Sequence, residues 1–206
     1  MSCLRLVASL AVAVALMGGP AVAESPPVGQ PEQMPPPAPP LKELAAPQPL
    51  QPGDAFGQEL TLPERPILYR EGESDWDSAF PSIVAAFKSL DGYLAKAGIK
   101  PSGPAMVIYT ETDDKGFKFR AALPVAETPK QAPGGDIAVG QAPSGKALKF
   151  VHRGSYEAMD STYEAITNYL DDKQLEAKDS FVEEYVTDPV TTGADALVVN
   201  VLVPVK

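Results

Sequence analysis

The chain has 206 residues, of which 44% are hydrophobic and 21% charged, and its formal net charge is −10. This composition is typical of a globular protein with room for one domain of ordinary size and a tail. The lysines and arginines form no cluster, so the chain lacks the basic surface that nucleic acids and acidic membranes require. We therefore expect neither as a partner.

Residues 1–23 have the pattern of a secretory signal peptide. Arg5 is their only charged residue, an apolar run continues to Met17, and small residues lead to Ala-Val-Ala at 21–23. This pattern predicts cleavage before Glu24, a periplasmic or secreted protein, and no stable membrane insertion after cleavage. A retained membrane anchor is the alternative, although the apolar run is shorter than the roughly 20 residues that span a bilayer.

Cysteine and histidine are each represented once in the chain, by Cys3 and His152. Cleavage of the signal peptide would remove Cys3, which leaves no disulfide, no thiolate nucleophile and no cysteine ligand. With a single histidine remaining, we expect no metal site and no cofactor.

The segment that follows the predicted signal peptide has the composition of a spacer. From Glu24 to about Asp54 proline is dense and aromatic residues are absent. Such a segment cannot bury enough apolar surface to fold, so we place a disordered proline-rich linker at residues 24–57 and the folded domain at 58–206. A P-x-x-P ligand for a partner protein is the alternative.

The folded domain contains an internal repeat. The segment DSAFPSI at Asp77 matches DSTYEAI at Asp160. Two sets of apolar residues with the spacing of one helix face also match, and they are Trp76, Phe80, Ile83 and Phe87 in the first half and Met159, Tyr163, Ile166 and Leu170 in the second. Strand patterns flank each predicted helix, so residues 59–125 and 136–206 each predict the order β-β-α-β-β. Two such halves, related by a pseudo-two-fold axis, predict an α+β fold with one antiparallel sheet and two long helices on one face.

Glycine and proline set the expected limits of the elements. Pro81 is tolerated only in the first turn of a helix, so the first helix should begin near Asp77 or Ser78 and end at Gly98. Gly72 and Gly154 lie at matching places before the two helices, and we expect each to form a tight strand-to-helix turn.

Two further motifs carry a resemblance to a known family. They are H-x-G-x-Y at His152, Gly154 and Tyr156, and E-x-Y-x-x-D-P over residues 183–189. With the rest of residues 59–206, they resemble the GyrI-like small-molecule-binding family, which is also the effector-binding domain of AraC-type and MerR-type regulators. The resemblance implies the same duplicated fold and a cleft between helices and sheet for organic, often cationic or aromatic, ligands. The helix-turn-helix of the regulators is missing here, so we carry over ligand binding and neither transcriptional control nor gyrase inhibition.

A candidate site follows from strand alternation together with this resemblance. On a strand, Phe181, Glu183 and Tyr185 face one way and Glu184 faces the other, where we expect it to take no part. The resemblance places the acid of the family's pocket at Glu183. Tyr109 matches Tyr185 in the repeat, and Trp76 and Tyr163 could close the cleft. The predicted ligand-binding residues are therefore Glu183, Tyr185, Tyr109, Trp76, Tyr163 and Phe181. The alternative is that the aromatic residues belong to the core and that Glu183 lies on a wet face of the sheet.

These observations predict an exported stand-alone domain that binds a small organic molecule, cationic or aromatic, without catalysis. The sequence indicates no particular protein partner. Two alternatives stay open. One is a hydrolase of small electrophilic compounds that uses a pocket Glu and Tyr, as the resemblance implies for some relatives. The other is a haem-binding protein of similar architecture with His152 as the axial ligand, although we expect a structural role for this histidine.

Overall fold

The structure is a computed structural model, and it describes residues 48–129, 133–178 and 180–206. The predicted signal peptide and most of the predicted linker lie outside these residues. No helix in the described ranges is long and apolar enough to cross a membrane.

The two halves have the predicted order of elements. The first half contains β1 (Phe56–Leu62), β2 (Pro66–Asp75), α1 (Ala79–Ala97), β3 (Met106–Thr112) and β4 (Gly116–Pro124). The second half contains β5 (Ile137–Gln141), β6 (Gly145–Gly154), α2 (Met159–Lys173), β7 (Val182–Tyr185) and β8 (Leu197–Pro204), with a short 3-10 helix, η1 (Tyr156–Ala158), before α2. The predicted fold class, α+β from a duplicated β-β-α-β-β unit, is confirmed.

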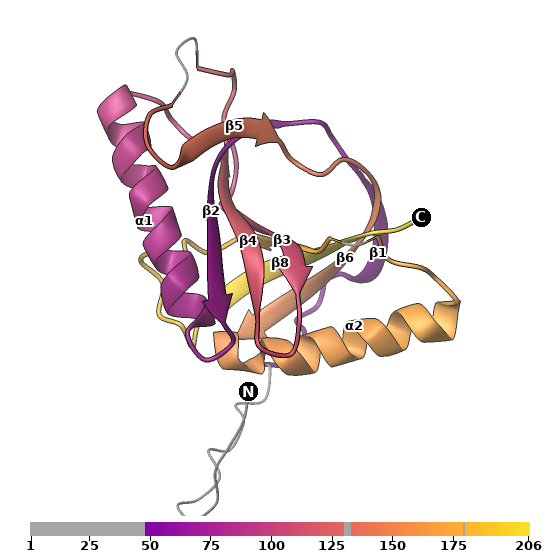
Figure 1. Cartoon of the computed structure of the whole chain (residues 1–206). Helices are drawn as coiled ribbons and strands as arrows, with labels where there is room; N and C mark the ends of the chain where they lie inside the picture. Colours follow the sequence, from indigo (N-terminus) through magenta and orange to yellow (C-terminus); the bar gives the residue numbers. More distant parts are fainter. Residues whose placement is uncertain (1–47, 130–132, 179) are drawn as a thin grey trace, which may run out of the picture. The chain divides into compact units, whose positions relative to one another are not determined.

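The strands form one eight-stranded antiparallel sheet in which the halves exchange their first strands (Figure 1). The strand order is β1-β6-β8-β7-β3-β4-β2-β5. Strand β1 of the first half pairs with β6 of the second, and β5 of the second pairs with β2 of the first. The halves also meet at the centre, where β3 pairs with β7 and Val107 lies opposite Glu183. Neither half has a complete sheet of its own, so the two must fold together.

One core joins both helices to one face of the sheet. Ile83 and Phe87 of α1 and Ile166 and Leu170 of α2 are buried in it, as the matching helix faces of the repeat predict. Figure 1 shows α1 beside β2 and the N-terminal end of α2 close to the N-terminal end of α1. The space where the two helix ends meet contains the candidate site.

The predicted limits of the first helix are confirmed. Helix α1 begins at Ala79 after the N-cap residue Ser78, whose N–H donates to Oδ1 of Asp75 at 2.7 Å. Pro81 lies in the first turn, where its missing N–H costs no helical hydrogen bond. Gly98 follows the helix with φ of +68°, which glycine adopts without strain.

The two glycines before the helices have different roles. Gly154 ends β6 with φ of +122° and provides the predicted turn. The prediction for Gly72 is wrong, because Gly72 lies inside β2 and pairs with Phe119. A Cβ atom at position 72 would lie 2.6 Å from the Phe119 ring. Glycine is therefore needed at this position for close packing of a ring and not for a turn.

The packed chain begins before the predicted domain boundary at residue 58. Strand β1 starts at Phe56, and Gln48 N–H donates to the carbonyl of Arg153 at 2.9 Å. The Arg153 guanidinium donates two hydrogen bonds to the Asp54 carboxylate, at 2.7 and 2.8 Å. These bonds from Arg153 lower the pKa of Asp54 from 3.8 to about 2. Residues 48–55 thus pack against the end of β6.

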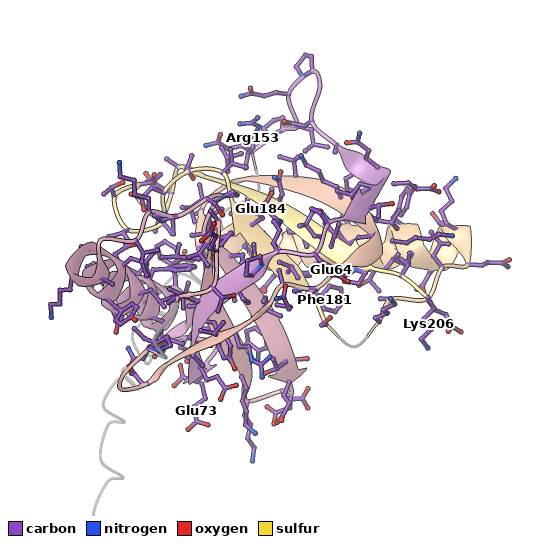
Figure 2. The ribbon with its side chains drawn as sticks, turned by 90° about the horizontal axis from the view of Figure 1, so that it is seen from above. Glu64, Glu73, Arg153, Phe181, Glu184 and Lys206 are labelled. Carbon is purple, nitrogen blue, oxygen red and sulfur yellow. The ribbon has the colours of Figure 1, made fainter. Side chains whose placement is uncertain are left out.

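The opposite face of the sheet carries a second, smaller apolar cluster with a polar group beside it. The carboxylate of Glu184 accepts hydrogen bonds from Asn200 at 2.9 Å and from Arg65 at 3.4 Å. In Figure 2 Glu184 lies toward the middle of the molecule, whereas Glu73 lies at its edge. Glu184 faces away from Glu183 as predicted, but it is part of a half-buried network and is not a free surface residue.

Candidate functional site

A cavity of about 900 Å³ lies where the N-terminal ends of α1 and α2 meet the sheet. Its walls come from the segment before α1, the β3–β4 hairpin, the turn into α2, and the segments on either side of β7. Because equivalent elements of the two halves line it, the pseudo-symmetry of the fold creates one shared site. Phe80 and Tyr163, which match in the repeat, both reach this cavity.

Glu183 lies at the floor of the cavity, and its side chain is fully buried. Its Oε1 atom accepts hydrogen bonds from the hydroxyls of Tyr109 and Tyr163, both at 2.9 Å. Its Oε2 atom accepts one from Tyr185 at 2.8 Å. Within the described ranges no lysine, arginine or histidine forms an ion pair with it. Three tyrosine hydroxyls thus donate hydrogen bonds to the carboxylate, which has no cationic partner among the described residues.

A fourth tyrosine extends this network. The hydroxyl of Tyr156 lies 3.0 Å from that of Tyr109. Since Tyr109 gives its proton to Glu183, Tyr156 must donate to Tyr109. The ring of Tyr156 stacks on Phe80 with 5.0 Å between the ring centroids, which joins the start of α1 to the turn before α2.

Burial controls the protonation of this network. Desolvation raises the pKa of Glu183, and the three tyrosine hydroxyls that donate to it oppose that rise. Burial, and then the nearby charge of Glu183, raises the pKa values of Tyr109, Tyr163 and Tyr185 well above 10.0. The phenols therefore stay neutral and keep their protons as hydrogen-bond donors.

The structure brings most of the predicted ligand-binding residues to the cavity. Glu183, Tyr109, Tyr163 and Phe181 line its interior, and Trp76 lies in its wall with 45% of its surface exposed. The indole N–H of Trp76 donates to the carbonyl of Asp113 at 2.9 Å and so ties the segment before α1 to the β3–β4 hairpin.

Tyr185 does not line the cavity. It is buried against Phe87, with 5.8 Å between the two ring centroids, and its hydroxyl donates to Glu183. Its contact with a ligand would therefore be indirect, through the carboxylate that it holds.

Several lining residues were not predicted from the sequence. Tyr156 belongs to the H-x-G-x-Y motif, and Phe80 matches Tyr163 in the repeat, so both carried a signal that could have identified them. The acidic lining was not predicted at all. Among the lining residues that the structure describes, seven are Asp or Glu and none is Lys, Arg or His. Apart from Glu183, these acids are Asp77, Asp113, Asp114, Glu157, Asp160 and Asp195.

His152 has a structural position. Its side chain is buried, does not line the cavity, and uses both ring nitrogens. Nε2 lies 3.0 Å from the carbonyl of Ser155, which can only accept, so Nε2 carries the proton and Nδ1 accepts from the Thr162 hydroxyl at 2.8 Å. Burial lowers the pKa of His152, which favours this neutral form. A histidine with both nitrogens occupied by protein does not fit the role of a haem ligand.

The described residues contain no group of three His, Cys, Asp or Glu side chains that could hold a metal ion. The carboxylates around the cavity are spread over its walls and do not converge on one point.

Comparison with known proteins gives one family and several structures of similar fold. A family model described as a GyrI-like small molecule binding domain matches residues 58–206. A search of curated proteins by sequence found no match. The crystal structure of the EcmrR C-terminal domain is similar with a TM-score of 0.62 and 16% identity, over 74% of this chain and 98% of that one.

EcmrR in a cryo-EM structure of its complex with DNA has a TM-score of 0.64 and 16% identity, over 73% of this chain. The match spans 57% of that longer chain. The structure of SAV2435 bound to tetraphenylphosphonium has a TM-score of 0.51 and 15% identity, over 73% of this chain and 94% of that one. A hydrolase from Listeria innocua has a TM-score of 0.52 and 12% identity, over 74% and 93% of the two chains. At these identities the structures show a shared fold.

Proposed function

Because this chain belongs to the GyrI-like small-molecule-binding family, we propose that it binds a small organic cation with an aromatic body in the cavity around Glu183. The proposal concerns the kind of ligand and the place where it binds. The observation that carries it is the buried carboxylate of Glu183, which has hydrogen-bond donors around it but no cation.

The negative charge of Glu183 favours a cationic ligand. An ionised carboxylate in an apolar environment is costly unless hydrogen bonds or an opposite charge compensate it. Three phenol donors compensate part of this cost and leave the net charge in place. A ligand cation above the carboxylate would neutralise that charge where water is largely excluded, and where the attraction is stronger than in bulk water.

The cavity walls favour the same class of ligand. Phe80, Tyr156, Tyr163 and Phe181 offer ring faces and edges to a flat or bulky apolar body. The acidic residues around them produce a field of one sign that raises the local concentration of cations and disfavours anions. The structure of SAV2435 bound to tetraphenylphosphonium supports this choice by analogy of fold.

We propose further that the protein acts as an exported, stand-alone binding domain. The support is the signal-peptide pattern of residues 1–23 and the proline-rich composition of the segment that follows. Proteolytic removal of residues 1–23 in cells, followed by recovery in the periplasmic or secreted fraction, is the expected result. An intact N-terminus in the membrane fraction would contradict it.

Titration with tetraphenylphosphonium tests the proposed site. Trp76 is the only tryptophan of the chain and lines the cavity, so its fluorescence should report binding directly. Glu183→Gln keeps the shape and removes the charge, and it should weaken tetraphenylphosphonium binding by about 1–4 kcal/mol, the Coulomb attraction between two unit charges about 4 Å apart at dielectric constants between those of water and a protein surface. Neutral triphenylphosphine oxide should bind the wild type and the variant almost equally.

Glu164→Gln is the matched control, because Glu164 is exposed on α2 and does not line the cavity. Equal effects of the two substitutions, or no binding of the cation to the wild type, would refute the proposed function. Slow consumption of an electrophilic ligand by the wild type, lost in Glu183→Gln, would instead favour the hydrolase alternative, with Glu183 as general base.

A further inference from the structure

We infer that the segment Lys42–Pro47 of this chain docks over the mouth of the cavity and competes with the ligand, with the Lys42 ammonium beside the carboxylates of Asp160 and Asp195. The segment lies outside the described residues, and the inference concerns the place where it binds. It rests on the proposed function and adds to it a control of access that is part of the same chain.

The described chain begins beside the wall of the cavity. The N–H of Gln48 donates to the carbonyl of Arg153 at 2.9 Å. A Cβ atom at Gly154 would lie 3.2 Å from the backbone nitrogen of Gln48, so the two segments are packed closely. The lining of the cavity starts with the next two residues, Ser155 and Tyr156. The segment that precedes Gln48 therefore joins the domain close to the cavity.

The segment is long enough to reach the mouth of the cavity. Lys42 precedes Gln48 by six residues, and six residues of extended chain span up to about 20 Å. The lysine side chain adds further reach. The attachment at Gln48 thus keeps the Lys42 ammonium within range of the acidic lining.

Two acidic residues of the lining belong to the wall that is nearest to Gln48. The N–H of Tyr156 donates to the carbonyl of Ala194 at 2.9 Å, and Asp195 is the next residue. Asp160 lies in the first turn of α2, shortly after Tyr156. Both acids line the cavity and are exposed, so an ammonium group can approach them from solvent without reaching the buried floor.

Charge favours Lys42 as the occupant of this place. It is the only lysine or arginine within residues 24–64, whereas the described lining carries seven acids and no cation. On an extended chain Leu44 faces the same side as Lys42, and Glu43 faces the other side. The segment therefore presents a cation together with an apolar group, which is the combination that we propose for the ligand.

The covalent link makes even a weak contact sufficient. A short linker holds its two ends at an effective concentration on the order of millimolar. A contact of millimolar affinity would then be formed in about half to four-fifths of the molecules. Since the apparent affinity for a ligand falls in proportion to the open fraction, the segment lowers it by a factor of about two to five.

The test compares four proteins by Trp76 fluorescence. They are the wild type, Lys42→Gln, a chain shortened to residues 48–206, and the control Lys88→Gln, which removes the same charge from an exposed position on α1 outside the lining. Each is titrated with tetraphenylphosphonium and with neutral triphenylphosphine oxide. The shortened chain should bind both compounds about two- to fivefold more tightly than the wild type, because the whole cavity is open. Lys42→Gln should gain nearly as much, and Lys88→Gln should match the wild type.

The neutral compound separates occupation of the cavity from a general effect of charge. Loss of a positive charge strengthens the attraction for a cation and leaves a neutral molecule unaffected. A gain for tetraphenylphosphonium alone would therefore overturn the inference, and so would equal affinities in the wild type and the shortened chain. In both cases the proposed function stands, because the cation still binds.

Cross-linking of the ligand-free wild type gives a second readout. A carbodiimide joins an amine and a carboxylate that are in contact, through an amide bond formed with loss of water. Mass spectrometry should find Lys42 joined to Asp160 or Asp195, and tetraphenylphosphonium should reduce the yield. Links of Lys42 only to acids outside the lining would overturn the inference. If none of the four proteins binds either compound, the proposed function fails, and the cross-link alone then decides whether the segment docks at the cavity.

Discussion

Glu183 and Tyr185 lie two residues apart on the same face of β7, and Tyr185, which does not line the cavity, donates to the carboxylate with 2.8 Å between its hydroxyl and Oε2. Tyr109 and Tyr163 reach the same carboxylate through Oε1 and line the cavity themselves. Both oxygens of the carboxylate thus accept hydrogen bonds from tyrosine hydroxyls. Tyr185 can therefore alter ligand binding without touching a ligand.

Tyr185→Phe removes one hydrogen bond to Glu183 and keeps the ring that packs on Phe87. Because a carboxylate that accepts fewer hydrogen bonds ionises less readily, the pKa of Glu183 should rise further. The affinity for tetraphenylphosphonium should then be lost at a higher pH than in the wild type, and it should fall by about 1 kcal/mol at neutral pH. Calorimetric titrations between pH 5 and 8 would measure both effects. An unchanged pH profile would mean that Tyr185 only fills space.

A second prediction concerns the stability of the empty protein as a function of pH. Burial raises the pKa of Glu183 above its ordinary value of 4.5, so the folded protein holds this proton over a pH interval in which the unfolded chain has lost it. The stability due to this group is therefore complete below 4.5 and falls as the pH rises through the raised pKa. Relative to Glu183→Gln, the wild type should become less stable as the pH increases through this interval.

Urea unfolding of the two proteins at a series of pH values would measure this difference. Glu164→Gln provides the control, because Glu164 is exposed. Its substitution should change the free energy of unfolding by the same amount at every pH. Saturating tetraphenylphosphonium should remove the loss in the wild type, since the ligand supplies the missing charge. A wild type that gains stability over the same interval would show that the three phenols more than compensate the burial of the charge.

Much of this site is implicit in the repeat. The spacing of apolar residues predicted both helices, and the match of Tyr109 with Tyr185 predicted two equivalent strands that deliver tyrosines to one place. The structure pairs these strands in register at the centre of the sheet, with Val107 opposite Glu183. A pseudo-two-fold relation therefore explains why residues of both halves meet at one cavity.

The rest of the site depends on information that the local sequence does not contain. Asp113 and Asp160 are ordinary surface acids by sequence, and only the folded structure brings both to the wall of one cavity. The repeat predicts a turn at Gly72 because Gly72 matches Gly154 before a helix, whereas its role comes from Phe119 on the neighbouring strand. Such contacts join residues far apart in the chain. Neither the periodicity of apolar residues nor the secondary-structure propensity of single residues therefore predicts them.

The segment before β1 yields a third prediction. The composition of residues 24–54 predicts that their removal leaves the midpoint of thermal unfolding unchanged. In the structure, however, residues 48–54 pack against the end of β6. Deleting 24–47 should have little effect. Deleting 24–54 should lower the midpoint, because the Asp54 carboxylate and its two hydrogen bonds from Arg153 are lost.

The role of the ion pair in this segment is testable by acid unfolding. The pKa of Asp54 is lowered from 3.8 to about 2, so its contribution to stability is present above 3.8 and is lost as the pH falls toward 2. Asp54→Asn should abolish the loss of stability that the titration of Asp54 causes at acid pH. In a protein that already carries Arg153→Gln, it should have no further effect on stability. Additive effects of the two substitutions would show that the contact is not an energetic pair.

The last prediction compares two adjacent glutamates of β7 by the same substitution. Glu183 faces the cavity and has no cationic partner, whereas Glu184 faces the opposite side and accepts from Asn200 at 2.9 Å and Arg65 at 3.4 Å. Its side chain is 16% exposed, so these bonds are only partly replaced by water. Glu184→Gln should lower the free energy of unfolding by about 1–2 kcal/mol and leave tetraphenylphosphonium affinity unchanged. Glu183→Gln should lower the affinity and leave the stability at neutral pH equal or higher. Urea unfolding and fluorescence titration of both variants measure the four quantities. If Glu184→Gln weakened ligand binding and left stability intact, the assignment of the two faces of β7 would be wrong.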